Sequence, residues 1–109
     1  MIIGITGKYA SGKDSVAEYL TSKGFLHFSL SDEIRAEARR KKIKITRENL
    51  ISLGNELREK FGAGILAERA LLKLRSGQDY VISSIRNPEE VKVLQQEKDF
   101  VLIAVNTSH

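Results

Sequence analysis

A short glycine-rich stretch near the start of the chain carries residue types that bind phosphate. It runs from Gly7 to Lys13 and fits the P-loop (Walker A) pattern G-x-x-x-x-G-K. Glycines allow successive backbone N–H groups to point at one spot, and the lysine places an ammonium against the outer phosphates. The pattern predicts ATP binding. The residues expected to hold the nucleotide are Gly7, Ala10, Ser11, Gly12, Lys13, Asp14 and Ser15.

The position after Lys13 leaves the metal ligand open. Most P-loops carry Ser or Thr there, and its hydroxyl binds the Mg²⁺ that accompanies ATP. This chain has Asp14 followed by Ser15. Asp14 can take the metal role directly or through water, or it only begins a helix, where a carboxylate suits the dipole. The candidate Mg²⁺ ligands are therefore Asp14, Ser15 and Asp32 of a later segment.

A second candidate phosphate contact is Arg35, in the segment 29–35 that follows a predicted strand and begins a helix. A guanidinium one turn into that helix can face the same cleft as the P-loop and grip a second phosphate through paired hydrogen bonds. Asp32 can orient this arginine or help to hold metal-bound water. The alternative is an ordinary capped helix with a surface arginine.

A third candidate is Arg86, just beyond another predicted strand. In many P-loop proteins this strand ends in an aspartate that helps to hold Mg²⁺, whereas here Ser83 and Ser84 stand at its end. Arg86 can meet an anionic substrate at the strand end. The alternative is a loop arginine paired with Glu89 or Glu90.

Alternating strands and helices must position these residues. We predict strands at 2–6, 26–29, 80–83 and 100–105, and helices at 13–23, 31–41, 65–74 and from Pro88, besides one that Thr46 caps and Gly62 ends. This alternation indicates an α/β fold with a parallel sheet and helices on both faces. We expect three layers and the strand order 2-3-1-4, with the first strand central. Ligands of such sheets bind at the carboxyl ends of the strands, where each candidate residue falls.

Two finer expectations concern the middle helices. Ser31 is expected to cap the helix at 31–41, since serine side chains accept hydrogen bonds from free N–H groups at a helix start. In the next helix, four apolar residues at helical spacing are expected to pack in the core, part of them able to line a base pocket. They are Leu50, Leu53, Leu57 and Phe61.

Size and composition exclude several classes of protein. The chain has 109 residues, is 41% hydrophobic and 29% charged, and contains no cysteine. Its length allows one small domain, which we place at 1–109. No apolar run approaches the roughly 20 residues of a membrane span, and the N-terminus has no signal-like region, so we expect a cytoplasmic protein with no membrane partner. The net charge of +4 suits anionic ligands such as nucleotides, but without interleaved aromatic residues nucleic-acid binding is not expected.

Together these segments resemble the nucleoside monophosphate kinase group of P-loop proteins, which includes adenylate kinases and dephospho-coenzyme A kinases. The stretch at 31–35 looks like their acceptor-binding segment, and the stretch at 82–86 looks like their D-G-F-P-R segment. The resemblance implies that Arg35 and Arg86 bind the acceptor's phosphate. The Gly-Lys-Asp variant at 12–14 is similar to deoxynucleoside monophosphate kinases of phages.

A closer resemblance is to the kinase-like N-terminal domain of some microbial deoxycytidylate deaminase-related proteins. The stretches that carry it are 27–32, 46–50, 54–58 and 84–91. The chain has no cysteine, so the zinc-binding cysteines of the deaminase are absent.

Two functions follow from these features. The first is phosphoryl transfer from ATP–Mg²⁺ to a small phosphorylated acceptor, with Lys13, Arg35 and Arg86 as the catalytic residues. The second is a non-catalytic nucleotide-binding module, favoured by Ser83 in place of Asp and by the absence of the arginine-bearing lid that follows the fourth strand in the kinases. The chain is then a fragment or a natural minimal protein. In either case we expect the edge of the last strand to support a homo-oligomer.

Overall fold

The computed structural model describes residues 1–7 and 13–105, with nine elements that alternate along the chain. The four strands are β1 (Ile2–Gly7), β2 (Leu26–Ser29), β3 (Tyr80–Ser83) and β4 (Phe100–Val105). The five helices are α1 (Lys13–Ser22), α2 (Ser31–Arg40), α3 (Arg47–Phe61), α4 (Ile65–Lys73) and α5 (Pro88–Leu94). No helix in these ranges is long and apolar enough to cross a membrane.

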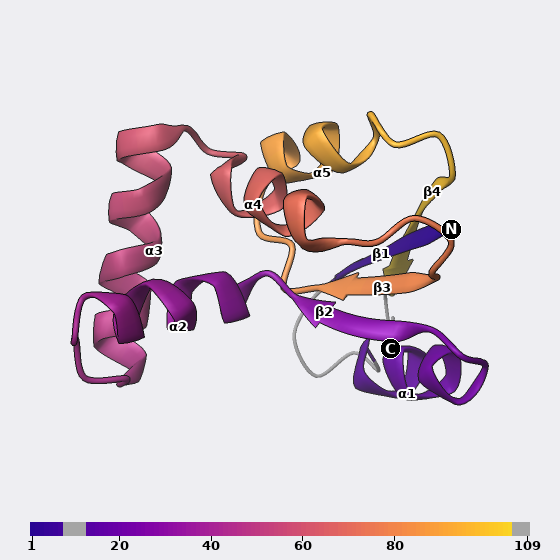
Figure 1. Cartoon of the computed structure of the whole chain (residues 1–109), viewed down its shortest axis with the longest axis horizontal. Coiled ribbons are helices and arrows are strands. Elements are labelled where there is room, and N and C mark those ends of the chain that lie inside the picture. Colours follow the sequence, from indigo (N-terminus) through magenta and orange to yellow (C-terminus); the bar gives the residue numbers. More distant parts are fainter. Residues whose placement is uncertain (8–12, 106–109) are drawn as a thin grey trace, which may run out of the picture.

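The four strands form one parallel sheet in the order β2-β3-β1-β4 (Figure 1). The α/β class and the strand order predicted from the sequence are therefore confirmed. β1 lies inside the sheet, with Ile3 beside Val81 of β3 and Val101 of β4. A parallel arrangement brings the carboxyl ends of neighbouring strands to one edge of the sheet, and this edge faces α2 and α3 (Figure 1).

Helices cover both faces of the sheet and give three layers. On one face, α1 packs its Ala17 against Ile3, Ile5 and Val81. On the other face, α2, α3, α4 and α5 share a second cluster with Ile82 of β3. On β3 the neighbours Val81 and Ile82 belong to different clusters, because successive side chains of a strand point to opposite faces. The members of the larger cluster are Leu30, Ile34, Ala38, Leu53, Leu57, Leu66, Ala67, Ala70, Ile82 and Leu94.

Local signals explain some of the helix ends. Gly24 has a φ of +98° after α1, and the N–H of Phe25 donates to the carbonyl of Leu20, as in a Schellman ending. Thr46 caps α3 as predicted, because its side chain accepts from the N–H of Asn49. The prediction that Ser31 caps α2 is wrong. α2 already includes Ser31, its N-cap position is Leu30, and no side-chain cap is present there.

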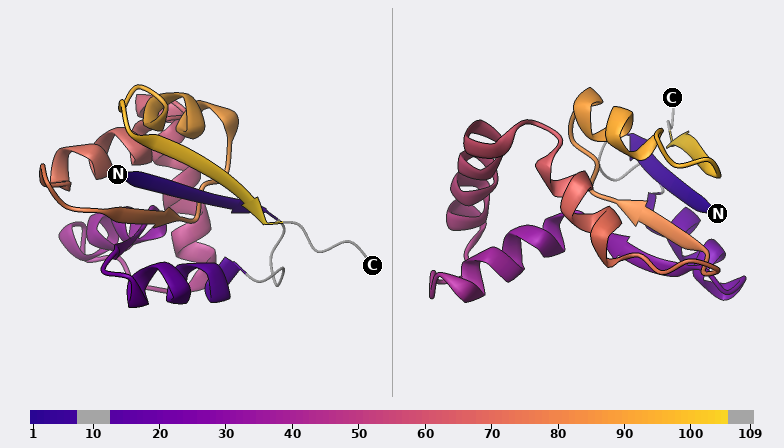
Figure 2. Two further views of the ribbon diagram at one scale, coloured as in Figure 1. Left: turned by 90° about the vertical axis from the view of Figure 1, so that its right-hand side faces the viewer. Right: turned by 45° about the horizontal axis from the view of Figure 1, so that its top comes forward.

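The pair α2–α3 extends beyond the carboxyl edge of the sheet, as Figure 1 and the right-hand view of Figure 2 show. The two helices contact each other and α4. The apolar stripe of α3 packs inward at Leu53 and Leu57, which are buried. Phe61 departs from the prediction: its side chain is half exposed, and the guanidinium of Arg69 lies 5.4 Å from its ring centre.

Candidate functional site

The described ends of the P-loop segment stand where a phosphate-binding loop requires them. β1 ends at Gly7 and α1 begins at Lys13, so residues 8–12 join the carboxyl end of an inner strand to the start of a helix. Ala10, Ser11 and Gly12 lie outside the described residues, as do the side chains of Lys13 and Asp14. The start of a helix presents free N–H groups and a positive dipole end, both of which favour a bound anion.

A cavity of about 610 Å³ lies between the α2–α3 pair and the carboxyl ends of β2 and β3. This volume is in the range typical of small-molecule sites. The apolar part of its wall combines one isoleucine of α2 with residues of α3 and the segment before it. The lining residues are Ser31, Ile34, Arg35, Ile45, Thr46, Arg47, Leu50, Ile51, Asn55, Arg58, Ser84 and Arg86.

The cavity is strongly basic. Four arginines line it, and none of the described lining residues is acidic. Arg35 and Arg86, the two arginines singled out in the sequence, lie on its wall together, although they are distant along the chain. Guanidinium groups form paired hydrogen bonds with phosphate and carboxylate oxygens. A cavity with this lining can hold an anionic group together with an apolar or aromatic body.

Arg35 is held by its own helix. Its Nη1 donates to Oδ1 of Asp32 at 2.9 Å and to Oγ of Ser31 at 3.2 Å. Of the two roles considered for Asp32, the structure therefore shows the contact that orients Arg35. The pair with Asp32 is about half exposed, with 40% of the Arg35 side chain and 61% of the Asp32 side chain accessible, so it stabilises the fold little.

Hydroxyl groups connect the ends of β2 and β3 next to Arg35. Oγ of Ser29 lies 2.8 Å from Oγ of Ser31 and 2.7 Å from Oγ of Ser84. Ser84 adopts a φ of +64°, which non-glycine residues rarely do. The backbone turn at Ser84 is therefore a strained position at the cavity wall, and such strain recurs at binding sites.

Arg86 is held through its backbone. Its N–H donates to Oε1 of Glu90 at 2.6 Å, while its side chain is exposed and forms no ion pair with a described residue. Glu90 therefore contacts the backbone of Arg86 and does not form the ion pair with its side chain that the alternative interpretation required. The guanidinium paired with Glu90 belongs to Arg58 of α3.

The end of β3 carries a hydroxyl–imidazole contact. Nε2 of His27, on β2, lies 2.7 Å from Oγ of Ser83. Among the side chains that the structure describes, which exclude that of Asp14, no group of three or more histidine or acidic residues is close enough to hold a metal ion. Of the three candidate Mg²⁺ ligands, Asp32 contacts Arg35, and the Asp14 side chain lies outside the described part.

Part of the apolar stripe of α3 was expected to line a pocket, and Leu50 does line the cavity, but the sequence prediction missed the rest of the contribution of α3. Arg47, Ile51, Asn55 and Arg58 all line the cavity. Their spacing of i, i+4, i+8 and i+11 places them along one side of a helix. A polar and basic face beside the buried Leu53 and Leu57 was readable in the sequence, but nothing in the sequence alone said that this face points at the end of β3.

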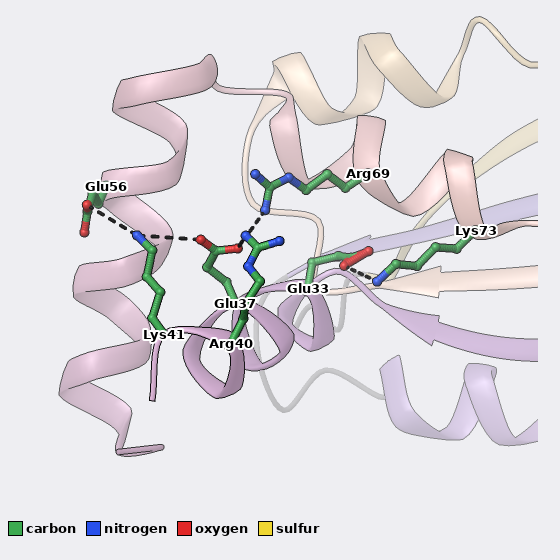
Figure 3. A network of polar contacts seen from close by, with 7 residues as sticks. All are labelled: Glu33, Glu37, Arg40, Lys41, Glu56, Arg69 and Lys73. Atoms are coloured by element: carbon green, nitrogen blue, oxygen red, sulfur yellow. Dashed lines mark hydrogen bonds and ion pairs between the residues drawn. The ribbon is translucent and has the colours of Figure 1, made fainter. Parts of the chain in front are cut away.

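Outside the cavity, a network of ion pairs joins α2 to α3 and α4 (Figure 3). Glu37 of α2 is buried, accepts hydrogen bonds from Arg40 and Arg69 and forms an ion pair with Lys41. Glu33, one turn earlier, accepts from Lys73 at 2.6 Å. These contacts hold the back of α2 against α4, so the opposite side of α2 can present Arg35 to the cavity.

Comparison with models of known protein families finds no match. The chain is 34% identical over 110 residues to a UPF0200 protein of Hyperthermus butylicus, covering 99% of the chain and 59% of that relative. It is 30% identical over 114 residues to a UPF0200 protein of Thermococcus kodakarensis, covering 98% and 62%. The chain thus spans about three fifths of the length of these curated relatives.

Among solved structures, an APS kinase mutant from Mycobacterium tuberculosis matches over 97% of the chain and 75% of its own length. The TM-score is 0.52 and the sequence identity is 22%, so this likeness concerns the fold. The link to deaminase-related proteins stays a prediction. The chain has the fold of the P-loop kinases.

Proposed function

We propose that the chain binds ATP–Mg²⁺ at the P-loop and transfers a phosphoryl group to a small phosphorylated acceptor in the arginine-lined cavity. The observation that carries this proposal is the cavity itself, with four arginines and an apolar wall at the carboxyl edge of the sheet. A P-loop between β1 and α1 begins at the same edge. Donor and acceptor phosphates would then meet there.

The mechanism requires positioning and charge neutralisation and no covalent nucleophile. Amides of the P-loop hold the donor phosphates, and Lys13 neutralises charge as the γ-phosphoryl leaves. Arg35 and Arg86 hold the acceptor's phosphate, while the aliphatic side chains of Ile34, Leu50 and Ile51 contact its body. Asp14 and Ser15 are the candidate ligands that would hold Mg²⁺, which would supply positive charge against the donor phosphates.

Calorimetric titration with ATP–Mg²⁺ tests the donor half. We expect Lys13→Ala to abolish measurable binding, because the motif lysine supplies the ammonium that faces the outer phosphates. Lys23→Ala is the matched control: it removes the same charge at the exposed far end of α1, beside Tyr19. Equal loss in both variants would contradict the assignment.

Product detection tests the acceptor half. Nucleoside monophosphates and dephospho-coenzyme A are added with ATP–Mg²⁺, and ADP is measured. Arg35→Ala should raise the acceptor KM with little change in the KM for ATP. Arg39→Ala, one turn further along α2 and exposed, should leave both unchanged. Lys13-dependent ADP formation with one acceptor establishes a kinase and names its substrate.

A non-catalytic nucleotide-binding module is the second candidate, favoured by the contact of Ser83 with His27 at a strand end where kinases place an acidic residue. Such a module would act through a partner or a second copy. β4 is an edge strand of the described sheet, and Val101 and Leu102 on it are 45% and 39% exposed. We propose self-association through this edge. Sedimentation that finds only monomer at high concentration would exclude it.

A further inference from the structure

Glu90, in the first turn of α5, is a buried carboxylate in contact with two parts of the cavity wall. It is fully inaccessible to solvent. Its Oε1 accepts from the backbone N–H of Arg86 at 2.6 Å and of Asn87 at 3.3 Å. The Asn87 contact belongs to the capping box that begins α5. The shorter bond to Arg86 lies outside that motif and fixes the loop that carries a cavity arginine.

The second oxygen of the same carboxylate reaches across to α3. Oε2 of Glu90 lies 3.4 Å from Nη2 of Arg58, whose side chain is 21% exposed and lines the cavity. Nε of Arg58 is buried and has no hydrogen-bond partner among the described residues. A buried charge requires a partner, so the Arg58 guanidinium must stay near Glu90. Glu90 and Arg58 therefore tie α3 to the loop after β3.

We propose that Glu90 is a positioning residue that sets Arg58 and Arg86 beside each other, so that both bind the same anionic group of the acceptor. This inference rests on the proposed function, because it assigns the two arginines to the acceptor's phosphate. It adds Arg58 to the anion-binding residues, and it gives Glu90 a role through them without contact to the acceptor.

The sign of the effect separates this role from simple electrostatics. A negative charge near the cavity repels an anion, so electrostatics alone predicts that Glu90→Gln binds phosphate more tightly. Positioning predicts weaker binding, because Arg58 loses the carboxylate that orients its donors. The glutamine keeps the size of the side chain and an oxygen that can accept from the N–H of Arg86.

The experiment follows the side-chain Nε–H signal of Arg86 by NMR in protein labelled with ¹⁵N-arginine, as inorganic phosphate is added. We expect phosphate to shift this signal in the wild type. In Glu90→Gln the affinity should fall about tenfold, the equivalent of one hydrogen bond to a charged group. Glu89→Gln is the control, since it removes the same charge one residue earlier, where the side chain is exposed and paired with Lys92. It should leave the affinity unchanged.

A double-mutant cycle tests whether Glu90 acts through Arg58. Arg58→Ala should weaken phosphate binding, and adding Glu90→Gln to it should change the affinity no further. If Glu90→Gln fails to fold by circular dichroism, Arg58→Lys serves in its place. It keeps a cation and leaves the backbone bonds of Glu90 intact, and it should weaken phosphate binding as much, because lysine lacks the planar fork.

The proposal is overturned if Glu90→Gln binds phosphate as tightly as the wild type or more tightly, if the two substitutions act independently, or if phosphate never shifts the Arg86 signal. None of these readings needs turnover. If Glu90→Gln binds phosphate more weakly and the wild type forms ADP with none of the acceptors, the positioning role is upheld and the kinase is rejected. ADP formation with an unshifted Arg86 signal would do the reverse.

Discussion

Buried carboxylates in two regions of this protein join helices to their neighbours, and the two regions differ in the partners of the carboxylates. Glu33 and Glu37 lie on the back of α2, and their described partners are lysine and arginine side chains whose exposed fractions run from 27% to 69%. Glu90 is fully buried, with backbone N–H groups and Arg58 as its partners. The α2 group is thus a surface network with buried anions, and Glu90 is an interior polar contact.

The difference teaches that burial of a carboxylate is by itself no sign of function. Cations of the α2 group can return to water when their anion is removed. The N–H groups of Arg86 and Asn87 cannot turn away, because their positions are set by the backbone. The Glu90 contact is also part of a cavity wall through Arg58 and Arg86, while none of the seven residues drawn in Figure 3 lines that cavity.

The largest effect on stability is expected for Glu90→Ala. The substitution leaves Arg58 without its anion and two backbone N–H groups without an acceptor, at a cost of about 3 kcal/mol in the free energy of unfolding. Urea denaturation measures it. Glu89→Ala, whose side chain is 54% exposed, should cost almost nothing. Equal urea midpoints for the two variants would contradict the proposed difference in stability contribution between an interior and a surface carboxylate.

A smaller loss is expected for Glu37→Gln. Its carboxylate has three cationic partners, of which Arg69 joins α2 to α4. Each partner keeps access to solvent, so we expect a loss of about 2 kcal/mol in the free energy of unfolding. The response of Arg86 to phosphate should not change. Glu56→Gln removes the exposed carboxylate that also contacts Lys41 and should be neutral. A changed phosphate affinity in Glu37→Gln would show that the α2 group also shapes the cavity.

The third largest loss of stability is expected for Asn87→Ala, which removes an uncharged side chain that contacts Glu90. Oδ1 of Asn87 accepts from the N–H of Glu90, and its Nδ2 donates to the carbonyl of Ala63. Loss of a helix cap of this kind costs about 1 kcal/mol. Thermal denaturation gives the comparison with Thr46→Ala, which removes the cap of α3 alone. A milder effect for Asn87→Ala than for Thr46→Ala would mean that the bond to Ala63 adds nothing.

The smallest effect is expected for Glu33→Gln. Oε1 of Glu33 has no partner among the described residues, and Lys73, which contacts Oε2, is 53% exposed. Removing the charge releases Lys73 to water and relieves the burial of an anion, so stability should change by less than about 0.5 kcal/mol. Denaturation at low and high salt checks this. A loss as large as that of Glu37→Gln would contradict the ranking within α2.

The fold was predictable from local patterns. The buried strands, the glycines that follow helices and the cap at Thr46 are each written in a few consecutive residues, and the predicted strand order is the one that the sheet has. Local patterns failed where packing decides. Ser31 has the chemistry of a cap, but the helix begins at Ser31 itself and its hydroxyl contacts Ser29 and Arg35 instead. Phe61 continues an apolar stripe, yet α3 extends past the core there.

The sequence by itself identified the candidate phosphate-binding residues and predicted that they follow strands, because a motif such as the one at 7–13 depends on its own residues and their immediate neighbours. It also placed Arg35 and Arg86 at one edge of the sheet. Only the tertiary structure decided that Glu90 pairs with Arg58 and that a face of α3 completes the cavity. Those contacts join residues that are distant along the chain, and they arise from the way α3 packs against the loop after β3.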